Sequence, residues 1–109
     1  MAAQRRGNGQ RIARIKEMEA ALNSAQEAAD QLSEAIQGQV DALDALQQLS
    51  AYYGSDEWYG DREADERGWL PEDLERGVLS EDAPYEALVS AREAALAAIE
   101  VAAATLRAL

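Results

Sequence analysis

The sequence predicts an all-α fold in which a long N-terminal helix packs antiparallel on a C-terminal helix, with a loop-rich aromatic cap of short helices between them. Residues 10–51 hold one glycine and no proline and are rich in good helix formers. The apolar residues of this stretch recur at heptad spacing, whereas glycines and aromatic residues concentrate in residues 52–83. We therefore expect a basic disordered tail over 1–9 and a single helical domain over 10–109, divided into 10–51, 52–83 and 84–109.

The first predicted helix carries one continuous apolar stripe over four to five heptads. Only one of the ten stripe positions is polar, which is typical of a helix that packs along its whole length. The ten positions are Ile15, Leu22, Ala29, Ile36 and Leu43 in one set, and Met18, Ala25, Leu32, Gln39 and Leu46 in the other.

The length of this helix predicts self-association. A helix of about 42 residues is about 63 Å long, whereas the C-terminal helix of about 26 residues reaches only about 39 Å. A break at Gly38 is not forced, because a glycine inside a helix costs only about 1 kcal/mol. We therefore expect a homodimer, and a monomeric three-helix bundle bent at Gly38 is the alternative. The candidate self-association residues are Ile15, Met18, Leu22, Leu32 and Ile36.

The predicted cap, residues 52–83, holds five of the six aromatic residues of the chain. Short helical turns are expected at 61–67 and 71–76. Tyr52, Tyr53 and Trp69 are expected to form its core, because a loop-rich stretch needs large apolar anchors.

The C-terminal helix is expected to begin near Pro84, which suits a first helical turn, with Asp82 as its N-cap residue. Ser80 has no histidine or lysine nearby in sequence that could activate it and is interpreted as a turn or capping hydroxyl.

Several runs of the chain resemble a small bacterial all-helical family of unknown function. They are YYGSDEW over 52–58, EADE over 63–66, LPEDLERGVLSED over 70–82, and the opening RIKEME over 14–19. The resemblance extends from about Ile12 to the end of the last helix. It implies a short stand-alone bacterial domain with a long first helix, and it supplies no catalytic residue because the family has no established activity.

Composition argues against several function classes. The chain has neither cysteine nor histidine, which removes thiolate metal sites, the usual general base near neutral pH and the commonest metal ligand. The acidic side chains of residues 63–82 could be imagined as a Mg²⁺ or Ca²⁺ site, but they lack the spacing of a calcium-binding loop. We predict no enzyme activity, no cofactor and no metal. No apolar run approaches a membrane span and the N-terminus lacks a signal-peptide core, so we expect a cytoplasmic protein without membrane contact.

Charge is uneven along the chain. Residues 1–16 carry a net charge of +5, residues 17–53 carry −7, and residues 54–83 carry −8. An acidic body repels phosphate, so direct nucleic-acid binding is not expected. Exposed aromatic residues ringed by charge are typical of protein interfaces, which makes the cap the candidate surface for an unidentified protein partner. The candidate partner-binding residues are Trp58, Tyr59, Asp56, Glu57, Asp61, Glu63, Asp65 and Glu66. For Trp58 and Tyr59, a place in the core of the cap is the alternative.

Three functions remain open at this point. The first is a small interaction or regulatory protein that binds a protein partner through the acidic, aromatic cap. The second is an inhibitor that mimics nucleic acid and occupies a basic cleft with its carboxylates. The third, a metal-dependent all-α hydrolase, is disfavoured by the absence of histidine.

Overall fold

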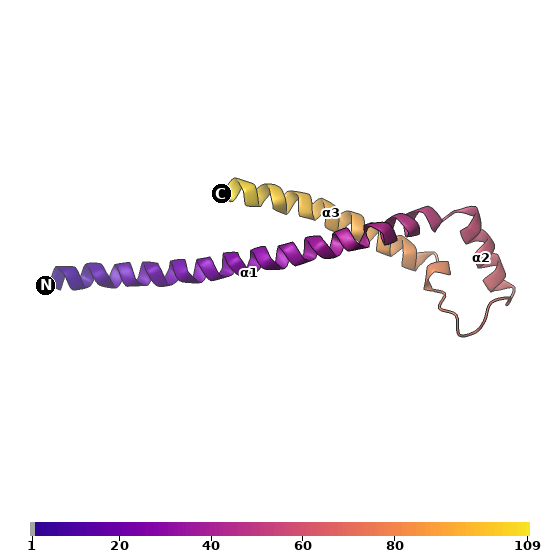
Figure 1. The fold of residues 1–109 in the computed structure, drawn as a ribbon, viewed down its shortest axis with the longest axis horizontal. Helices are drawn as coiled ribbons and strands as arrows, with labels where there is room; N and C mark the ends of the chain where they lie inside the picture. Colours follow the sequence, from indigo (N-terminus) through magenta and orange to yellow (C-terminus); the bar gives the residue numbers. More distant parts are fainter. Residues whose placement is uncertain (1) are drawn as a thin grey trace. The chain divides into compact units, whose positions relative to one another are not determined.

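The computed structural model describes residues 2–109, with side chains from Gly7 onward. The elements are α1 (Ala2–Tyr52), α2 (Asp56–Glu66), the 3-10 helix η1 (Gly77–Leu79) and α3 (Asp82–Ala108), shown in Figure 1. No strand occurs in this range. The predicted all-α class, with a long N-terminal helix and a C-terminal helix, is confirmed. The antiparallel packing of these two helices stays a prediction.

Helix α1 runs without a break through Gly38, as the cost of one glycine in a helix predicts. Its 51 residues correspond to a length of about 76 Å. It begins at Ala2, eight residues before the expected start at Gln10, so the structure differs from the disordered tail placed at 1–9. The physical reason is that alanine, glutamine and arginine at positions 2–6 are good helix formers, and they offset Gly7 and Gly9. Met1 lies outside the described residues.

The chain divides into two compact units, residues 1–42 and residues 43–109. The first unit is the N-terminal part of α1, in which every side chain from Gly7 to Asp41 is exposed. Its large apolar side chains are about half exposed: Ile12, Ile15, Met18, Leu22, Leu32, Ile36 and Val40. The first unit therefore has no hydrophobic core of its own.

The second unit has a small core at the junction of α2, η1 and α3. Its buried side chains are Trp58, Leu79 and Pro84, and η1 contacts both α2 and α3. Tyr52 and Tyr53 are half-buried, but Trp69, expected in the core, is 68% exposed. Trp58 takes the central place instead.

Both ends of α2 are closed by local hydrogen bonds. At its start the Ser55 hydroxyl accepts the Trp58 amide hydrogen at 3.2 Å, which satisfies one of the free donors of a helix N-terminus. At its end Gly68 has φ of 73°, a left-handed conformation that favours glycine. The Gly68 amide donates to the Asp65 carbonyl, and the Trp69 amide donates to the Ala64 carbonyl, both at 3.0 Å. This pair of bonds is the Schellman arrangement of a helix C-terminus.

Two glycine substitutions are expected to change stability in opposite directions. Gly68→Ala forces a Cβ into the left-handed region and is expected to cost about 1 kcal/mol. Gly60→Ala, inside α2, adds a Cβ that meets nothing within 4 Å and is expected to stabilise by about 0.5–1 kcal/mol. Urea unfolding of both variants measures the two changes, and equal signs would contradict the assigned helix end.

The segment between α2 and α3 contains less helix than expected. Residues 71–76 form only a turn closed by the Leu74 amide and the Pro71 carbonyl at 3.2 Å, not the predicted helical turn. Asp82 is the first residue of α3 and not its N-cap. The Ser80 hydroxyl takes the capping role, since it accepts the Ala83 amide hydrogen at 3.2 Å and donates to the Gly77 carbonyl at 2.7 Å. The interpretation of Ser80 as a capping hydroxyl is thus confirmed.

Within residues 2–109, none of the helices contains a stretch that is both long and apolar enough to cross a bilayer. The cytoplasmic location stays a prediction.

Candidate partner-binding surface

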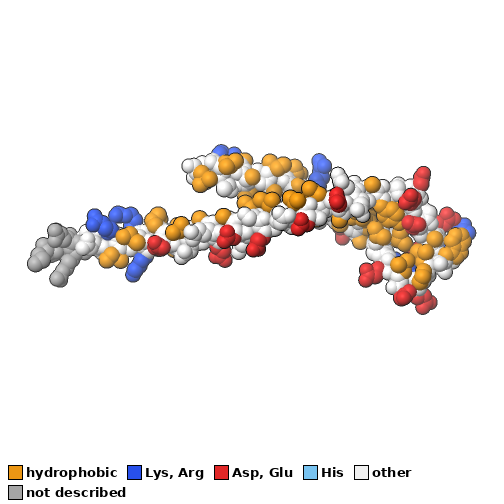
Figure 2. All heavy atoms as spheres, in the orientation of Figure 1, with side chains coloured by type: hydrophobic (Ala, Val, Ile, Leu, Met, Phe, Trp, Pro, Cys, Tyr) orange, Lys and Arg blue, Asp and Glu red, His pale blue; other side chains and the backbone are white. Residues whose placement is uncertain are grey.

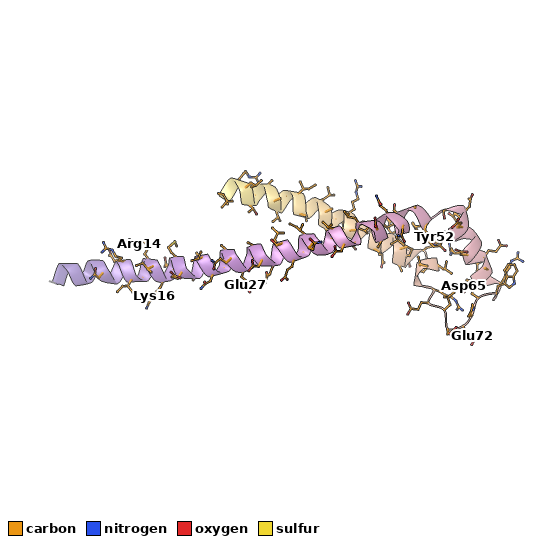
Figure 3. The ribbon with its side chains drawn as sticks, viewed as in Figure 1. Arg14, Lys16, Glu27, Tyr52, Asp65 and Glu72 are labelled. Carbon is orange, nitrogen blue, oxygen red and sulfur yellow. The ribbon has the colours of Figure 1, made fainter. Side chains whose placement is uncertain are left out.

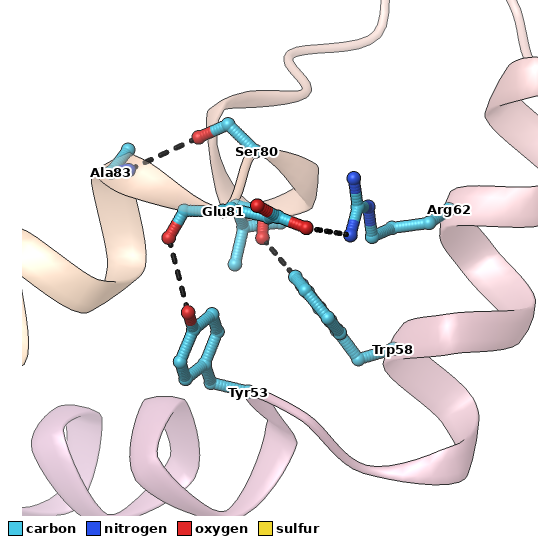
Figure 4. A network of polar contacts seen from close by, with 7 residues as sticks. Tyr53, Trp58, Arg62, Ser80, Glu81 and Ala83 are labelled. Atoms are coloured by element: carbon cyan, nitrogen blue, oxygen red, sulfur yellow. Dashed lines mark hydrogen bonds and ion pairs between the residues drawn. The ribbon is translucent and has the colours of Figure 1, made fainter.

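Trp58 lies at the centre of the contacts that join α2 to the residues before α3 (Figure 4). Its indole Nε1 donates to the Val78 carbonyl at 2.8 Å, and its side chain is 3% exposed. The rings of Tyr53 and Tyr59 contact it edge-on, each with centroids 5.0 Å away. The Tyr53 hydroxyl in turn donates to the Glu81 carbonyl at 3.1 Å, which ties the end of α1 to the start of α3. Of the two alternatives for Trp58, core or partner surface, the structure therefore has the core, because a side chain held this way inside the cap is not available at the surface.

All three arginines of the cap are engaged inside it. Arg62 stacks over the Trp58 ring at 4.8 Å and pairs with Glu81 at 3.1 Å. Arg67 pairs with Glu63 at 2.8 Å. The Nε of Arg76 lies 3.1 Å from Asp65 Oδ1, and its guanidinium also donates to the Pro71 carbonyl. Arg62 and Arg76 thus join α2 to segments farther along the chain, whereas the Arg67 pair is local to the end of α2.

These pairs leave a large excess of carboxylates. The cap carries eleven acidic residues, of which three pair with its arginines. Among the described residues the other eight have no cationic partner: Asp56, Glu57, Asp61, Glu66, Glu72, Asp73, Glu75 and Asp82. Figure 2 shows acidic side chains gathered over this part of the chain, and Asp65 and Glu72 are labelled in Figure 3. The surface of the cap is therefore strongly negative.

Two aromatic side chains are exposed beside these carboxylates. Tyr59 is 60% exposed and Trp69 is 68% exposed. The guanidinium of Arg67 lies over the Trp69 ring at 5.2 Å, which holds the indole in place without covering it. Large exposed aromatic groups with fixed positions are suited to anchor a protein partner.

Tyr52 and Asp61 connect the end of α1 to α2. The Tyr52 hydroxyl donates to the Asp61 carboxylate at 2.5 Å. This hydrogen bond, together with desolvation and the negative charges of Asp61 and Glu57, raises the pKa of Tyr52 to about 12. The Tyr52 side chain also lines a shallow open groove of about 560 Å³, with Gln48, Ala51, Ser55, Asp56 and Glu57 as the other lining residues. The carboxylates of Asp56 and Glu57 at this groove could attract a positively charged group of a partner.

The Tyr52 hydroxyl is expected to titrate near pH 12, not at its ordinary value near 10. Because the folded pKa is raised, the hydrogen bond to Asp61 stabilises the cap fully below pH 10 and is lost as the pH rises through 12. Ultraviolet titration of the tyrosines is expected to show one late step near pH 12 that belongs to Tyr52. In Asp61→Asn this step is expected to move back towards pH 10. A late step that persists in Asp61→Asn would contradict the assignment.

The remaining candidate residues all lie on or beside α2. Asp56, Glu57, Asp61, Glu63 and Glu66 are exposed on that helix, whereas Asp65 is half-buried against Arg76. Trp69 is an exposed aromatic side chain supported by Arg67, although the sequence predicts it in the core of the cap. A usable signal was the order Arg67-Gly68-Trp69 after a helical run, since a glycine at a helix end turns the next side chain away from the helix axis.

No group of three or more acidic side chains within the described residues is arranged to hold a metal ion. Arg62 and Arg76 neutralise two cap carboxylates, those of Glu81 and Asp65.

Comparisons with known proteins agree with the family suggested by the sequence runs. Neither a curated protein nor a solved structure is similar enough to this chain to count as a match. A family model described as a domain of unknown function (DUF4298) matches residues 15–101, from the apolar stripe of α1 into the second half of α3. The chain therefore belongs to this family of unknown function.

Proposed function

We propose that this protein is a non-enzymatic interaction protein that binds a positively charged protein partner through the acidic cap. One observation carries the proposal: the cap uses all of its arginines internally while eight carboxylates and two aromatic rings remain exposed. Such a surface offers electrostatic attraction and aromatic anchors to the same partner.

The chemistry of the side chains also favours binding over catalysis. The chain has no histidine and no cysteine, so it lacks the two side chains that most easily serve as base or nucleophile near neutral pH. The one large pKa shift in the described residues raises the pKa of Tyr52, which keeps this phenol protonated and unreactive.

Site-specific photocrosslinking in the cells that express the protein tests the proposal. A benzophenone amino acid at position 59 or 69 is expected to capture one discrete protein. The same group at Glu100, an exposed position of α3, serves as the control. Identical products from all three positions, or no product from positions 59 and 69, would contradict the proposal.

Charge neutralisation provides a quantitative second test once the captured partner is purified. The triple variant Glu66→Gln, Asp73→Asn and Glu75→Gln removes three cap carboxylates that have no cationic partner. It is expected to weaken binding roughly tenfold at low salt, mainly through slower association. The matched control Glu86→Gln, Glu93→Gln and Glu100→Gln changes the net charge equally but lies on α3, and it is expected to leave the affinity nearly unchanged.

The excess of unpaired carboxylates also favours a second candidate, an inhibitor that mimics nucleic acid. Its partner is a nucleic-acid-binding protein, and the carboxylates occupy the cleft that otherwise holds phosphates. Competition with DNA or RNA for the captured partner separates the two functions. The substitutions Tyr59→Ala and Trp69→Ala weaken the first function strongly and the second only slightly.

A further inference from the structure

Within the first unit, residues 7–42 form an amphipathic helix whose apolar side chains are exposed. None of the residues from Gly7 to Asp41 is buried. A single helix gains little stability from propensity alone, and long helices in proteins depend on packing of an apolar face. A contiguous exposed apolar stripe is therefore a surface that needs an occupant.

We propose that this face binds the same face of a second copy of the chain. The two helices are antiparallel and related by a two-fold axis that passes between them at the level of Glu27. Stripe residues that lie equally far before and after this level therefore face each other. Met18 then lies opposite the partner copy's equivalent of Ile36, and Leu22 opposite the equivalent of Leu32. Residues of the two heptad sets face each other in every layer, as antiparallel coiled coils require, and both copies use the same patch.

The residues that flank the stripe fit the same arrangement. Ile12 and Val40, both about half exposed, take the same heptad position beside the stripe and lie on opposite sides of the axis, so an antiparallel pair brings them together along one edge. One edge of the stripe consists of small residues that allow the helices to approach closely: Ala21, Ala28, Ala35 and Ala42. The apolar face is thus wider than the two heptad sets alone and extends along both of their edges.

Charge selects the antiparallel orientation. Lys and Arg side chains lie near the N-terminal end of the unit and acidic side chains follow farther along (Figures 2 and 3). A parallel pair would bring the basic ends of both copies, which hold Arg11 and Arg14, close together. An antiparallel pair instead places the basic end of each copy beside the acidic part of the other copy, which holds Glu34 and Asp41. This longer-range attraction between opposite charges favours the antiparallel orientation.

The acidic side chains in the middle of the unit do not oppose this pairing. Glu27 and Glu34 take the heptad position opposite the stripe, and Asp30 lies beside that position. These carboxylates point outward to solvent in the pair, where like-charge repulsion is weakened by water and salt.

Sedimentation of the full-length protein, combined with disulfide mapping, tests the proposal. The chain has no cysteine, so introduced thiols report without background. Mixed Met18→Cys and Ile36→Cys proteins are expected to form a disulfide between the two variants under mild oxidation, whereas each variant alone is expected to form little. Disulfides within each single variant would indicate a parallel pair and overturn the orientation.

A matched pair of double variants tests the surface. Leu22→Asp with Leu32→Asp places charges in one facing layer and is expected to weaken the dimer more than 100-fold. Ala20→Asp with Gln31→Asp adds the same groups off the stripe and is expected to leave it intact. A wild-type chain that sediments as a monomer at tens of micromolar would overturn the proposal.

Discussion

Trp58→Ala is expected to destabilise the cap by about 3–5 kcal/mol, the range for removing a buried tryptophan. The side chain is 3% exposed, and it joins α2 to the residues before α3 through its hydrogen bond to the Val78 carbonyl. Its removal also takes away the ring against which Tyr53, Tyr59 and Arg62 pack. Urea unfolding followed by near-ultraviolet circular dichroism reports on the cap and not on the long helix.

Two companion variants make this expectation specific. Trp58→Phe keeps an aromatic ring but loses the Nε1 donor, so its cost is expected to be about 1–3 kcal/mol, which corresponds to an unsatisfied Val78 carbonyl. Trp69→Ala removes a ring that is 68% exposed and is expected to change stability by less than about 1 kcal/mol. Equal costs for Trp58→Ala and Trp69→Ala would show that the two tryptophans are wrongly assigned.

Leu79→Ala is expected to cost about 2–4 kcal/mol, the second largest effect in the chain. Leu79 is 9% exposed and belongs to η1, which contacts both α2 and α3. A cavity at this position is expected to loosen η1, which contacts both α2 and α3. The same unfolding measurement applies.

Leu74→Ala is the matched control for Leu79→Ala, because it makes the same chemical change five residues earlier. Leu74 is 49% exposed in the turn before η1, and its truncation is expected to cost less than about 1 kcal/mol. A cost as large as that of Leu79→Ala would mean that the turn is packed against the rest of the cap.

The two long helices could be predicted because their determinants are local. Heptad spacing over residues 15–46 and the absence of proline indicate a helix without knowledge of its neighbours in space. The same reasoning correctly predicted that Gly38 does not interrupt α1. The helix begins earlier than predicted because the helix formers at positions 2–6 offset the cost of Gly7 and Gly9.

The interior of the cap could not be predicted because its determinants are not local. Trp58 and Trp69 each stand among charged residues and glycines in the sequence. Trp58 is buried because the Val78 carbonyl, 20 residues later, accepts its N–H group. Trp69 is exposed because the helix end at Gly68 directs it outward. The glycine before Trp69 is a local signal for its exposure, but no local signal indicates that Trp58 is buried.

The candidate surface was predicted in part for the same reason. The acidic excess is a property of composition and was visible at once, and five of the six acidic candidates are exposed on α2. Ion-pair partners depend on the approach of separate elements, such as α2 with the residues before α3, and the sequence does not specify that approach.

The contrasting positions of the two tryptophans give the protein a pair of built-in optical reporters. Trp58, shielded from water, is expected to emit at short wavelength and to resist quenching by iodide, whereas Trp69 emits at long wavelength and is quenched readily. The Trp69→Phe protein thus reports on the integrity of the cap. The Trp58→Phe protein, if it stays folded, reports on any molecule that covers the outer aromatic surface, so that binding can be followed without a label.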